Sequence, residues 1–368
     1  MTPLGQELAR LIRDEGPLSV SRYMALALGH PRHGYYMKQD PFGAAGDFTT
    51  APEISQIFGE LIGLWAATAW RMMGEPAPFR LVELGPGRGT LMQDMLRAGK
   101  VVSGFREALT VHMVETSPVL RERQRATLAA SGMAPVWHER IEDALDGPAL
   151  IVANEFLDAL PLDQFVLTPE GWRERLVGLD GEGRFAFGLS AEPEGRMARA
   201  APQGAVLEQP LAALETVATV ARHVAAEGGA GLFIDYGAVQ TGFGDTLQAM
   251  RQHGFVDPLA EPGDADLTVH VDFERMAQAG RAAGAAVHGA VRQRDFLLAL
   301  GLEQRVAALS RRAVPEQAAR LAAGASRLVA ADRGTDMGQL FKVLALADPR
   351  LPLLPGFDLH RLPEQAAP

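Results

Sequence analysis

The sequence predicts an α/β fold in which helices cover both faces of a largely parallel sheet. Short apolar runs alternate with amphipathic helical patterns over much of the 368-residue chain. Hydrophobic residues make up 47% of the chain and charged residues 22%, which supplies a sizeable core and a polar surface. A glycine-rich turn, ELGPGRG, joins one apolar run to the helix after it. Such a turn brings bare backbone amides against a ligand.

The N-terminal part of the chain, residues 1–75, is expected to be helical. Apolar residues at helical spacing predict helices over residues 4–14, 19–29 and 52–73. Before the last of these, Thr50 and Glu53 fit a capping box, and Pro52 lies early in the helix as capping allows.

The central part alternates strands and helices. Strands are predicted over residues 80–83, 110–115, 135–137, 149–153, 231–235 and 338–347. Helices are predicted over residues 90–98, 117–130, 208–227, 272–284, 294–301 and 315–330. Ligands of such sheets bind beyond the carboxyl ends of the strands. We therefore look for a site there.

Residues 76–348 are expected to form one domain with insertions at about 163–189 and 238–330. Turn signals in the first insertion predict a β-hairpin or a three-stranded meander. The start of the second, residues 238–271, is poor in regular patterns and rich in Gly, Pro and Asp, as functional or mobile loops are. The proline-rich residues 349–368 are expected to be an irregular surface arm.

Composition excludes several classes of function. The formal net charge of −10 disfavours a nonspecific nucleic-acid binder. The absence of cysteine excludes disulfides, thiolate nucleophiles and cysteine-ligated zinc, and no histidine pattern predicts a metal site. The longest apolar run, Leu61–Trp70, is too short to cross a bilayer, and the N-terminus resembles neither a signal nor a transit peptide. A cytoplasmic protein without membrane insertion is expected.

The glycine turn discriminates between ligands. Its residues Gly85, Pro86, Gly87 and Gly89 follow a predicted strand. A phosphate-binding P-loop would need a lysine that is absent, and Thr90 stands where a dinucleotide fingerprint has its third glycine. Glu83, two residues before the turn, would repel a pyrophosphate but attract the ammonium group of an amino acid.

Acids after the next two strands extend this interpretation. Glu115 is placed to bind ribose hydroxyls, and Glu142, beside Ile141 in the loop after the third strand, to meet an adenine amino group. An ammonium, a ribose and an adenine together describe S-adenosylmethionine better than a nicotinamide dinucleotide. Alternatively, Glu83 pairs with an arginine, Glu115 caps the following helix, and Glu142 lies on an exposed face.

The chain resembles the MidA-like family from about residue 5 to 348. The segments that carry the resemblance include GDFTTAPEISQIFGE, ELGPGRGTLMQDMLR, VETSPVLRERQ, NEFLDALPLDQFV, IDYG and GDADLTVHVDF. The resemblance implies a class I S-adenosylmethionine-dependent methyltransferase fold, Rossmann-like, with that cofactor. It also implies the activity of the mitochondrial members, protein arginine methyltransferases that assist assembly of respiratory complex I. One departure is Ala51, where many relatives have serine.

The implied substrate is an arginine on the 49-kDa subunit of NADH:quinone oxidoreductase, dimethylated symmetrically; its bacterial counterpart is the NuoD-like subunit. Three other functions stay open: a non-catalytic assembly chaperone, a methyltransferase with another substrate, and a nicotinamide-dependent oxidoreductase, which Glu83 and Thr90 disfavour. The oligomeric state also stays open, with a homodimer among the alternatives.

Candidate catalytic residues follow the fourth and fifth predicted strands. In NEFLDALP, Asn154 would contact the cofactor, while Glu155 and Asp158 are spaced to present two carboxylates to a guanidinium. The alternative is that Asp158 caps a short helix and Asn154 stabilises the turn. Asp235, in IDYG, would hold the guanidinium or one of its ligands.

Two further candidates come from loops. His270 is a candidate proton acceptor, although a lone histidine in an apolar alternation is more often structural. Phe48, in the loop before residue 52, is a candidate lid over the cofactor and an arginine channel.

Overall fold

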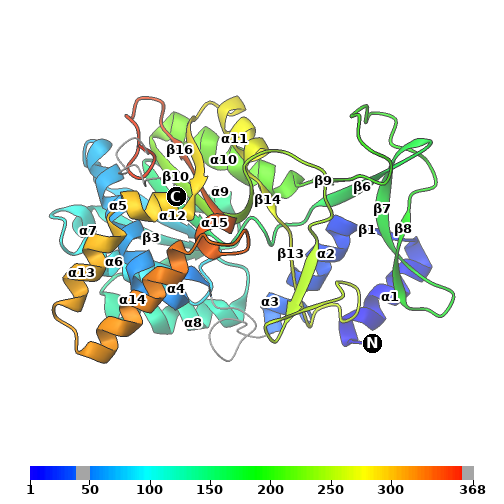
Figure 1. Cartoon of the computed structure of the whole chain (residues 1–368), viewed down its shortest axis with the longest axis horizontal. Helices are drawn as coiled ribbons and strands as arrows, with labels where there is room; N and C mark the ends of the chain where they lie inside the picture. Colours follow the sequence, from blue (N-terminus) through cyan, green and yellow to red (C-terminus); the bar gives the residue numbers. More distant parts are fainter. Residues whose placement is uncertain (39–49, 359–368) are drawn as a thin grey trace.

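The computed structural model describes residues 1–38 and 50–358, which form two lobes (Figure 1). The larger lobe is a twisted sheet with helices on both faces. The smaller lobe joins the N-terminal helices to short antiparallel sheets. The predicted α/β class is confirmed.

The central sheet runs in the order β15-β16-β10-β5-β2-β3-β4, with the short β14 beside β10. Its strands are β2 (Phe79–Leu84), β3 (Leu109–Val114), β4 (Val136–His138), β5 (Ala149–Asn154), β10 (Gly229–Ala238), β14 (Val271–Asp272), β15 (Ala286–Arg292) and β16 (Phe341–Ala347). All are parallel except β16, which is antiparallel to both of its neighbours. The strands β2 and β5 are buried along nearly their whole length because helices cover both faces of the sheet.

Helices pack against the two faces of this sheet. Those of the larger lobe are α4 (Ala51–Ile54), α5 (Gln56–Met72), α6 (Thr90–Gly99), α7 (Phe105–Ala108), α8 (Pro118–Leu128), α9 (Ile141–Ala144), α10 (Leu211–Glu227), α11 (Phe273–Ala282), α12 (Gln293–Ala299), α13 (Leu302–Ser310), α14 (Pro315–Val329) and α15 (Met337–Leu340), with the 3-10 turn η1 (Ala129–Ser131). One core lies between the sheet and α5, α6 and α12, and includes Trp65, Met95 and Phe296. A second core lies under α10 and α11, and includes Val217 and Met276.

The smaller lobe has its own core. Its elements are α1 (Pro3–Glu15), β1 (Leu18–Ser19), α2 (Val20–Gly29), α3 (Tyr35–Lys38), β6 (Asp163–Thr168), β7 (Gly171–Leu179), β8 (Phe185–Leu189), β9 (Val206–Gln209), β11 (Gln248–Arg251), β12 (Gly254–Val256) and β13 (Asp266–Thr268). Leu8 of α1 and Tyr23 of α2 pack there with Val177 of β7 and Leu267 of β13. The first insertion is thus a three-stranded meander, β6-β7-β8, which confirms one of the two predicted forms.

Several elements differ from the prediction. The expected helix over residues 52–73 breaks at Ser55, whose extended backbone separates α4 from α5. Residues 238–271 contain the sheet β12-β11-β13 rather than one long loop. The edge strand β15 and the helix α13 were not predicted, and residues 337–340 are helical before β16 begins.

The two segments that flank the predicted domain, residues 1–75 and 349–368, also differ from expectation where the structure describes them. Within residues 1–75, α1 and α2 belong to the smaller lobe, but α5 packs on the central sheet. In the C-terminal arm, Leu354 and Phe357 are buried in the core of the larger lobe, so residues 349–358 are irregular but not a free surface arm. In the described part of the chain, no helix combines the length and apolar character that a membrane span requires.

Candidate active site

The glycine turn follows β2 and leads into α6. Gly85, Gly87 and Gly89 have φ of 60°, 52° and 80°, all in the left-handed region that favours glycine. The N–H of Gly85 donates to Val114 O at 3.1 Å, which fixes the turn to the neighbouring strand β3. A Cβ on Gly85 would lie 2.6 Å from the ring of Phe156. The turn therefore needs glycine both for its conformation and for space.

Beneath this turn lies a small cavity of about 40 Å³, lined by Glu83, Gly85, Gly87, Asn154 and Glu155 among others. Glu83 Oε2 and Asn154 Oδ1 are buried and accept no hydrogen bond from residues 1–38 or 50–358. Burial raises the pKa of Glu83 well above its ordinary value. Two unpartnered acceptors at one cavity fit the ammonium group of an amino acid.

A larger cavity of about 430 Å³ adjoins the same turn and lies between the lobes. Gly85, Gly87, Glu115 and Phe156 line it from the larger lobe. The smaller lobe contributes Ala25, Leu28, Gly29, Tyr36 and Met37. Its size and mixed walls suit a nucleoside. The two cavities meet at the glycine turn, as a ligand with an amino-acid end and a nucleoside end requires.

Glu115, at the carboxyl end of β3, faces the larger cavity. Its Oε1 accepts the N–H of Ser117 at 2.8 Å, but Ser117 itself is the N-cap of α8, so Glu115 braces the start of that helix without capping it. Its Oε2 accepts Gln124 Nε2 at 3.0 Å. Sequence reasoning missed Gln124, although it is spaced four residues from Leu120 and from Leu128 on the buried face of α8.

Glu155 lies where the two cavities meet and lines both. Its φ is 50°, a conformation that costs energy outside glycine and that clusters at functional sites. Its Oε1 accepts the N–H of Ala51 and the side-chain amide of Asn154, each at 3.1 Å. Burial raises the pKa of Glu155 to about 7, because desolvation outweighs these two donors.

Asp158 and Asp235 lie behind Glu155. Asp235 Oδ2 accepts the N–H groups of Phe156, Leu157 and Asp158 at 2.9–3.2 Å, and its Oδ1 accepts that of Tyr236. Asp235 therefore fixes the turn that carries Glu155. Asp158 is buried, with a hydrogen bond from Tyr236, and desolvation raises its pKa to about 6. The described walls of the two cavities include neither carboxylate.

The remaining candidates lie elsewhere. Glu142 is exposed and pairs with Arg140, while Ile141 packs in a core; the described walls of the larger cavity include neither. His270 lines a separate cavity of about 150 Å³, and the centroid of its ring lies 5.5 Å from that of the Tyr236 ring. Burial lowers the pKa of His270. Phe48 lies outside the described residues.

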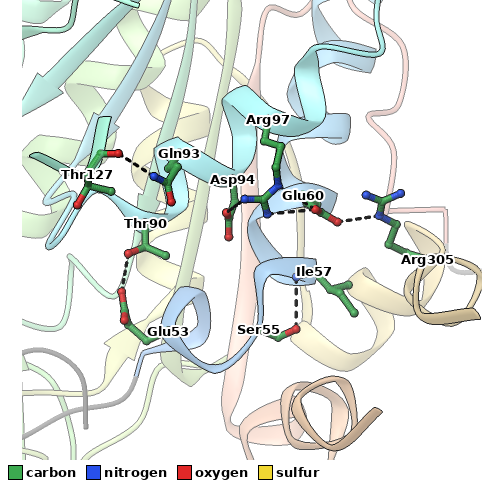
Figure 2. Close-up of polar contacts among 10 residues, drawn as sticks. All are labelled: Glu53, Ser55, Ile57, Glu60, Thr90, Gln93, Asp94, Arg97, Thr127 and Arg305. Atoms are coloured by element: carbon green, nitrogen blue, oxygen red, sulfur yellow. Dashed lines mark hydrogen bonds and ion pairs between the residues drawn. The ribbon is translucent and has the colours of Figure 1, made fainter. Parts of the chain in front are cut away.

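The helices α4 and α5 are tied to α6, the helix that follows the glycine turn (Figure 2). Glu53 accepts the hydroxyl of Thr90 at 2.6 Å, so it ties α4 to α6. The hydroxyl of Thr50 makes no capping bond, which corrects the predicted capping box. In α5, the buried Glu60 binds Arg97 of α6 and Arg305 of α13. Sequence reasoning missed Glu53 as a neighbour of the site.

Within residues 1–38 and 50–358, no three His, Asp or Glu side chains are grouped so that they could hold a metal ion. The groups that converge on the cavities are instead carboxylates, an amide and glycine backbone.

Comparison with known proteins agrees with this geometry. Residues 61–291 match a family described as S-adenosyl-L-methionine-dependent methyltransferases. A mitochondrial homolog of protein arginine methyltransferase NDUFAF7 from Drosophila melanogaster is 38% identical, over 93% of this chain and 84% of its own. The Mus musculus protein arginine methyltransferase NDUFAF7 is 36% identical, over 94% of this chain and 84% of its own.

A solved structure supports the same assignment. A protein from Burkholderia thailandensis, crystallised with S-adenosyl-homocysteine, is 30% identical and superposes with a TM-score of 0.82. The match covers 96% of this chain and 94% of that one. The predicted family resemblance and cofactor are confirmed. The chain belongs to the family of S-adenosylmethionine-dependent methyltransferases that includes the NDUFAF7 protein arginine methyltransferases.

Proposed function

We propose that this methyltransferase modifies an arginine side chain of a protein, and that Glu155 holds the guanidinium. Two relatives, each more than a third identical over most of the chain, are named protein arginine methyltransferases. The observation that carries the proposal is the position of Glu155, at the junction of the two cavities and on a strained backbone.

The cofactor site supports this arrangement. Glu83 and Asn154 are the proposed ligands of the amino-acid end, and Glu115 of the ribose, with the glycine backbone between them. S-adenosylmethionine supplies an electrophilic methyl group on its sulfonium sulfur when it is bound. Glu155, which lines both cavities, is therefore next to the place where the methyl donor and an acceptor would meet.

The chemistry of the acceptor explains why a carboxylate is needed. A guanidinium is charged at every ordinary pH, and its lone pairs are delocalised. The ionised Glu155 would draw the positive charge toward one nitrogen and orient another toward the methyl group. As the N–C bond forms and the C–S bond breaks, the nitrogen releases a proton. A carboxyl with a pKa of about 7 is suited to accept it.

The proposed substrate is the NuoD-like subunit of NADH:quinone oxidoreductase, dimethylated symmetrically in support of complex I assembly. Resemblance of the sequence motifs to the MidA-like family supports this finer assignment. Asp158 and Asp235 are proposed to act behind Glu155: Asp158 through its charge, and Asp235 by holding the turn.

Glu155→Gln tests the proposal. The variant keeps the shape of the side chain but not its charge, so S-adenosylhomocysteine should bind with nearly unchanged affinity in calorimetry. Arginine methylation of the purified NuoD-like subunit, followed by mass spectrometry, should fall by about 10²-fold or more. Retained turnover would remove Glu155 from the mechanism. Methylation by the native enzyme at another residue type would disprove the proposed arginine specificity.

A further inference from the structure

Gln124 of α8 is fully buried, and the mechanism above gives it no role. Its side-chain nitrogen donates two hydrogen bonds, to Gly87 O at 2.8 Å and to Glu115 Oε2 at 3.0 Å. Its oxygen accepts the indole N–H of Trp137 at 2.8 Å. All of its hydrogen-bonding groups are therefore engaged.

The orientation of this amide is fixed by chemistry. An indole nitrogen donates only, and a backbone carbonyl and a carboxylate accept only. Turning the amide over would place donor against donor at Trp137 and acceptor against acceptor at Glu115. The Gln124 amide therefore presents both of its N–H groups toward the cofactor cavities.

The two acceptors belong to different halves of the site. Gly87 lines both cavities from the turn between β2 and α6, whereas Glu115 lines the larger one from the end of β3. A Cβ built on Gly89 would also lie 3.5 Å from Gln124, in ordinary packing contact, so α8 supports the turn closely. One side chain thus links the glycine turn to the acid on the next strand.

We propose that Gln124 is a positioning residue for the cofactor, which fixes the spacing between the glycine turn and Glu115. The inference rests on the proposed role of Glu115 as the ribose ligand. Without the amide, Gly87 O and Glu115 Oε2 each lose a buried partner, and among the described residues Glu115 is held only through the backbone N–H groups on its Oε1 side. Both the glycine turn and Glu115 would then be less well placed for the cofactor, because a single ligand has to contact both at once.

The test compares Gln124→Leu with Gln93→Leu in the full-length protein, using calorimetry with S-adenosylhomocysteine. Gln93 is a matched control because its side chain also ties α6 to α8, by donating to Thr127 O at 2.7 Å (Figure 2), but contacts neither acceptor. We expect Gln124→Leu to weaken binding about tenfold or more, by analogy with the loss of residues that orient the ligands of a metal site. Gln93→Leu should change it by less than about twofold. Equal affinities for the two variants would overturn the inference.

A double-mutant cycle that combines Gln124→Leu with Glu115→Gln separates a positioning role from a general loss of structure. If Gln124 acts through Glu115, the loss of S-adenosylhomocysteine affinity in the double variant should be much smaller than the product of the losses in the two single variants. Independent, multiplicative losses would contradict the inference. If Glu115→Gln alone binds normally, the ribose assignment fails instead, so the two failures are distinguishable.

A second variant, Trp137→Phe, tests the inference if Gln124→Leu does not fold. Trp137→Phe removes the donor that orients the amide and leaves Gln124 in place. It should weaken S-adenosylhomocysteine binding several-fold, and less so when Glu115 is already Gln. An unchanged affinity in Trp137→Phe would count against the inference.

Discussion

At the residue scale, the site depends on a few groups held in costly states. Glu155 combines a positive φ with burial, and its pKa of about 7 leaves it divided between neutral and ionised forms near neutral pH. Glu83 is buried, and one of its oxygens has no hydrogen-bond partner within residues 1–38 and 50–358. Such states persist because the surrounding structure determines them, and they are typical of functional sites.

The raised pKa of Glu155 predicts the pH dependence of methylation. The ionised form is the one that binds a guanidinium, and it is lost as pH falls through about 7. The kcat/KM for the protein substrate should therefore decline below about pH 7, by up to about tenfold per pH unit, and level off above it. A pH–rate profile at saturating cofactor checks this. A profile that is flat between about pH 5.5 and 8 would argue against Glu155 as the ionised partner.

Gly85→Ala should disable the glycine turn. The variant adds the cost of a left-handed alanine, about 1 kcal/mol, and a contact of 2.6 Å with Phe156. We expect lower thermal stability and at least about tenfold weaker binding of S-adenosylhomocysteine. Gly147→Ala is the control, because Gly147 has a φ of 62° but nothing within 4 Å of an added Cβ. Equal affinities of the two variants would contradict the steric argument.

At the element scale, buried charges join the helices around the site (Figure 2). Glu60 of α5 is 3% exposed as a side chain and lies 2.7 Å from Arg305 Nε of α13 and 3.1 Å from Arg97 Nη2 of α6. Arg97 also binds the buried Asp94, whose pKa desolvation raises to about 6. Helices that come from distant parts of the sequence are thereby fixed to one another beside the glycine turn.

Arg305→Met should show the contribution of this network. Glu60 would keep Arg97 but lose half of its charge compensation while still buried, so we expect a loss of about 1–3 kcal/mol in the free energy of unfolding. Arg311→Met, at an exposed position just after the same helix, should change it by no more than about 0.5 kcal/mol. Urea denaturation of both variants measures the difference. Equal stabilities would mean that Arg97 by itself satisfies Glu60.

At the scale of the whole molecule, the larger cavity is completed by contact between the lobes. Tyr36 and Met37 of the smaller lobe face Glu115 and Phe156 of the larger one across the cavity. The hydroxyl of Ser117, at the start of α8, donates to Tyr36 O at 2.6 Å. The Tyr36 hydroxyl in turn donates to Asp266 at 2.8 Å. The wall of the cavity is therefore anchored on both sides.

Ser117→Ala should loosen that wall. It removes the bond to Tyr36 and the cap on Leu120 N, so we expect a loss of about 1 kcal/mol in stability and several-fold weaker S-adenosylhomocysteine binding. Thr2→Ala is matched, because Thr2 caps α1 and donates to Pro262 O away from the cavity. Thr2→Ala should lose a similar amount of stability but keep its affinity for S-adenosylhomocysteine. Both quantities follow from thermal melts with and without the ligand.

Local patterns predicted much of the fold and indicated where several candidate site residues lie relative to the strands. The strands β2, β3 and β5 are rich in apolar residues. Glu83 is the last residue but one of β2, and the glycine turn, Glu115 and Glu155 directly follow the carboxyl ends of β2, β3 and β5. The edge strand β15 was missed because its half-buried residues lack the continuous apolar pattern of the central strands. The break at Ser55 interrupts an otherwise continuous helical pattern and gives little local signal.

Other features depend on segments that are far apart in the sequence. Glu53 binds Thr90, Gln124 binds Gly87, and Ser117 binds Tyr36, and each of these pairs forms only when distant elements pack together. In the tertiary structure, the carboxylate of Asp235 likewise accepts backbone N–H groups, and His270 lies at another cavity. The sequence by itself determined the α/β class, the glycine turn and the acids at the strand ends, because these depend on local periodicity and conformation. The tertiary structure decided which acids reach the cavity and what holds them there, because packing sets those distances.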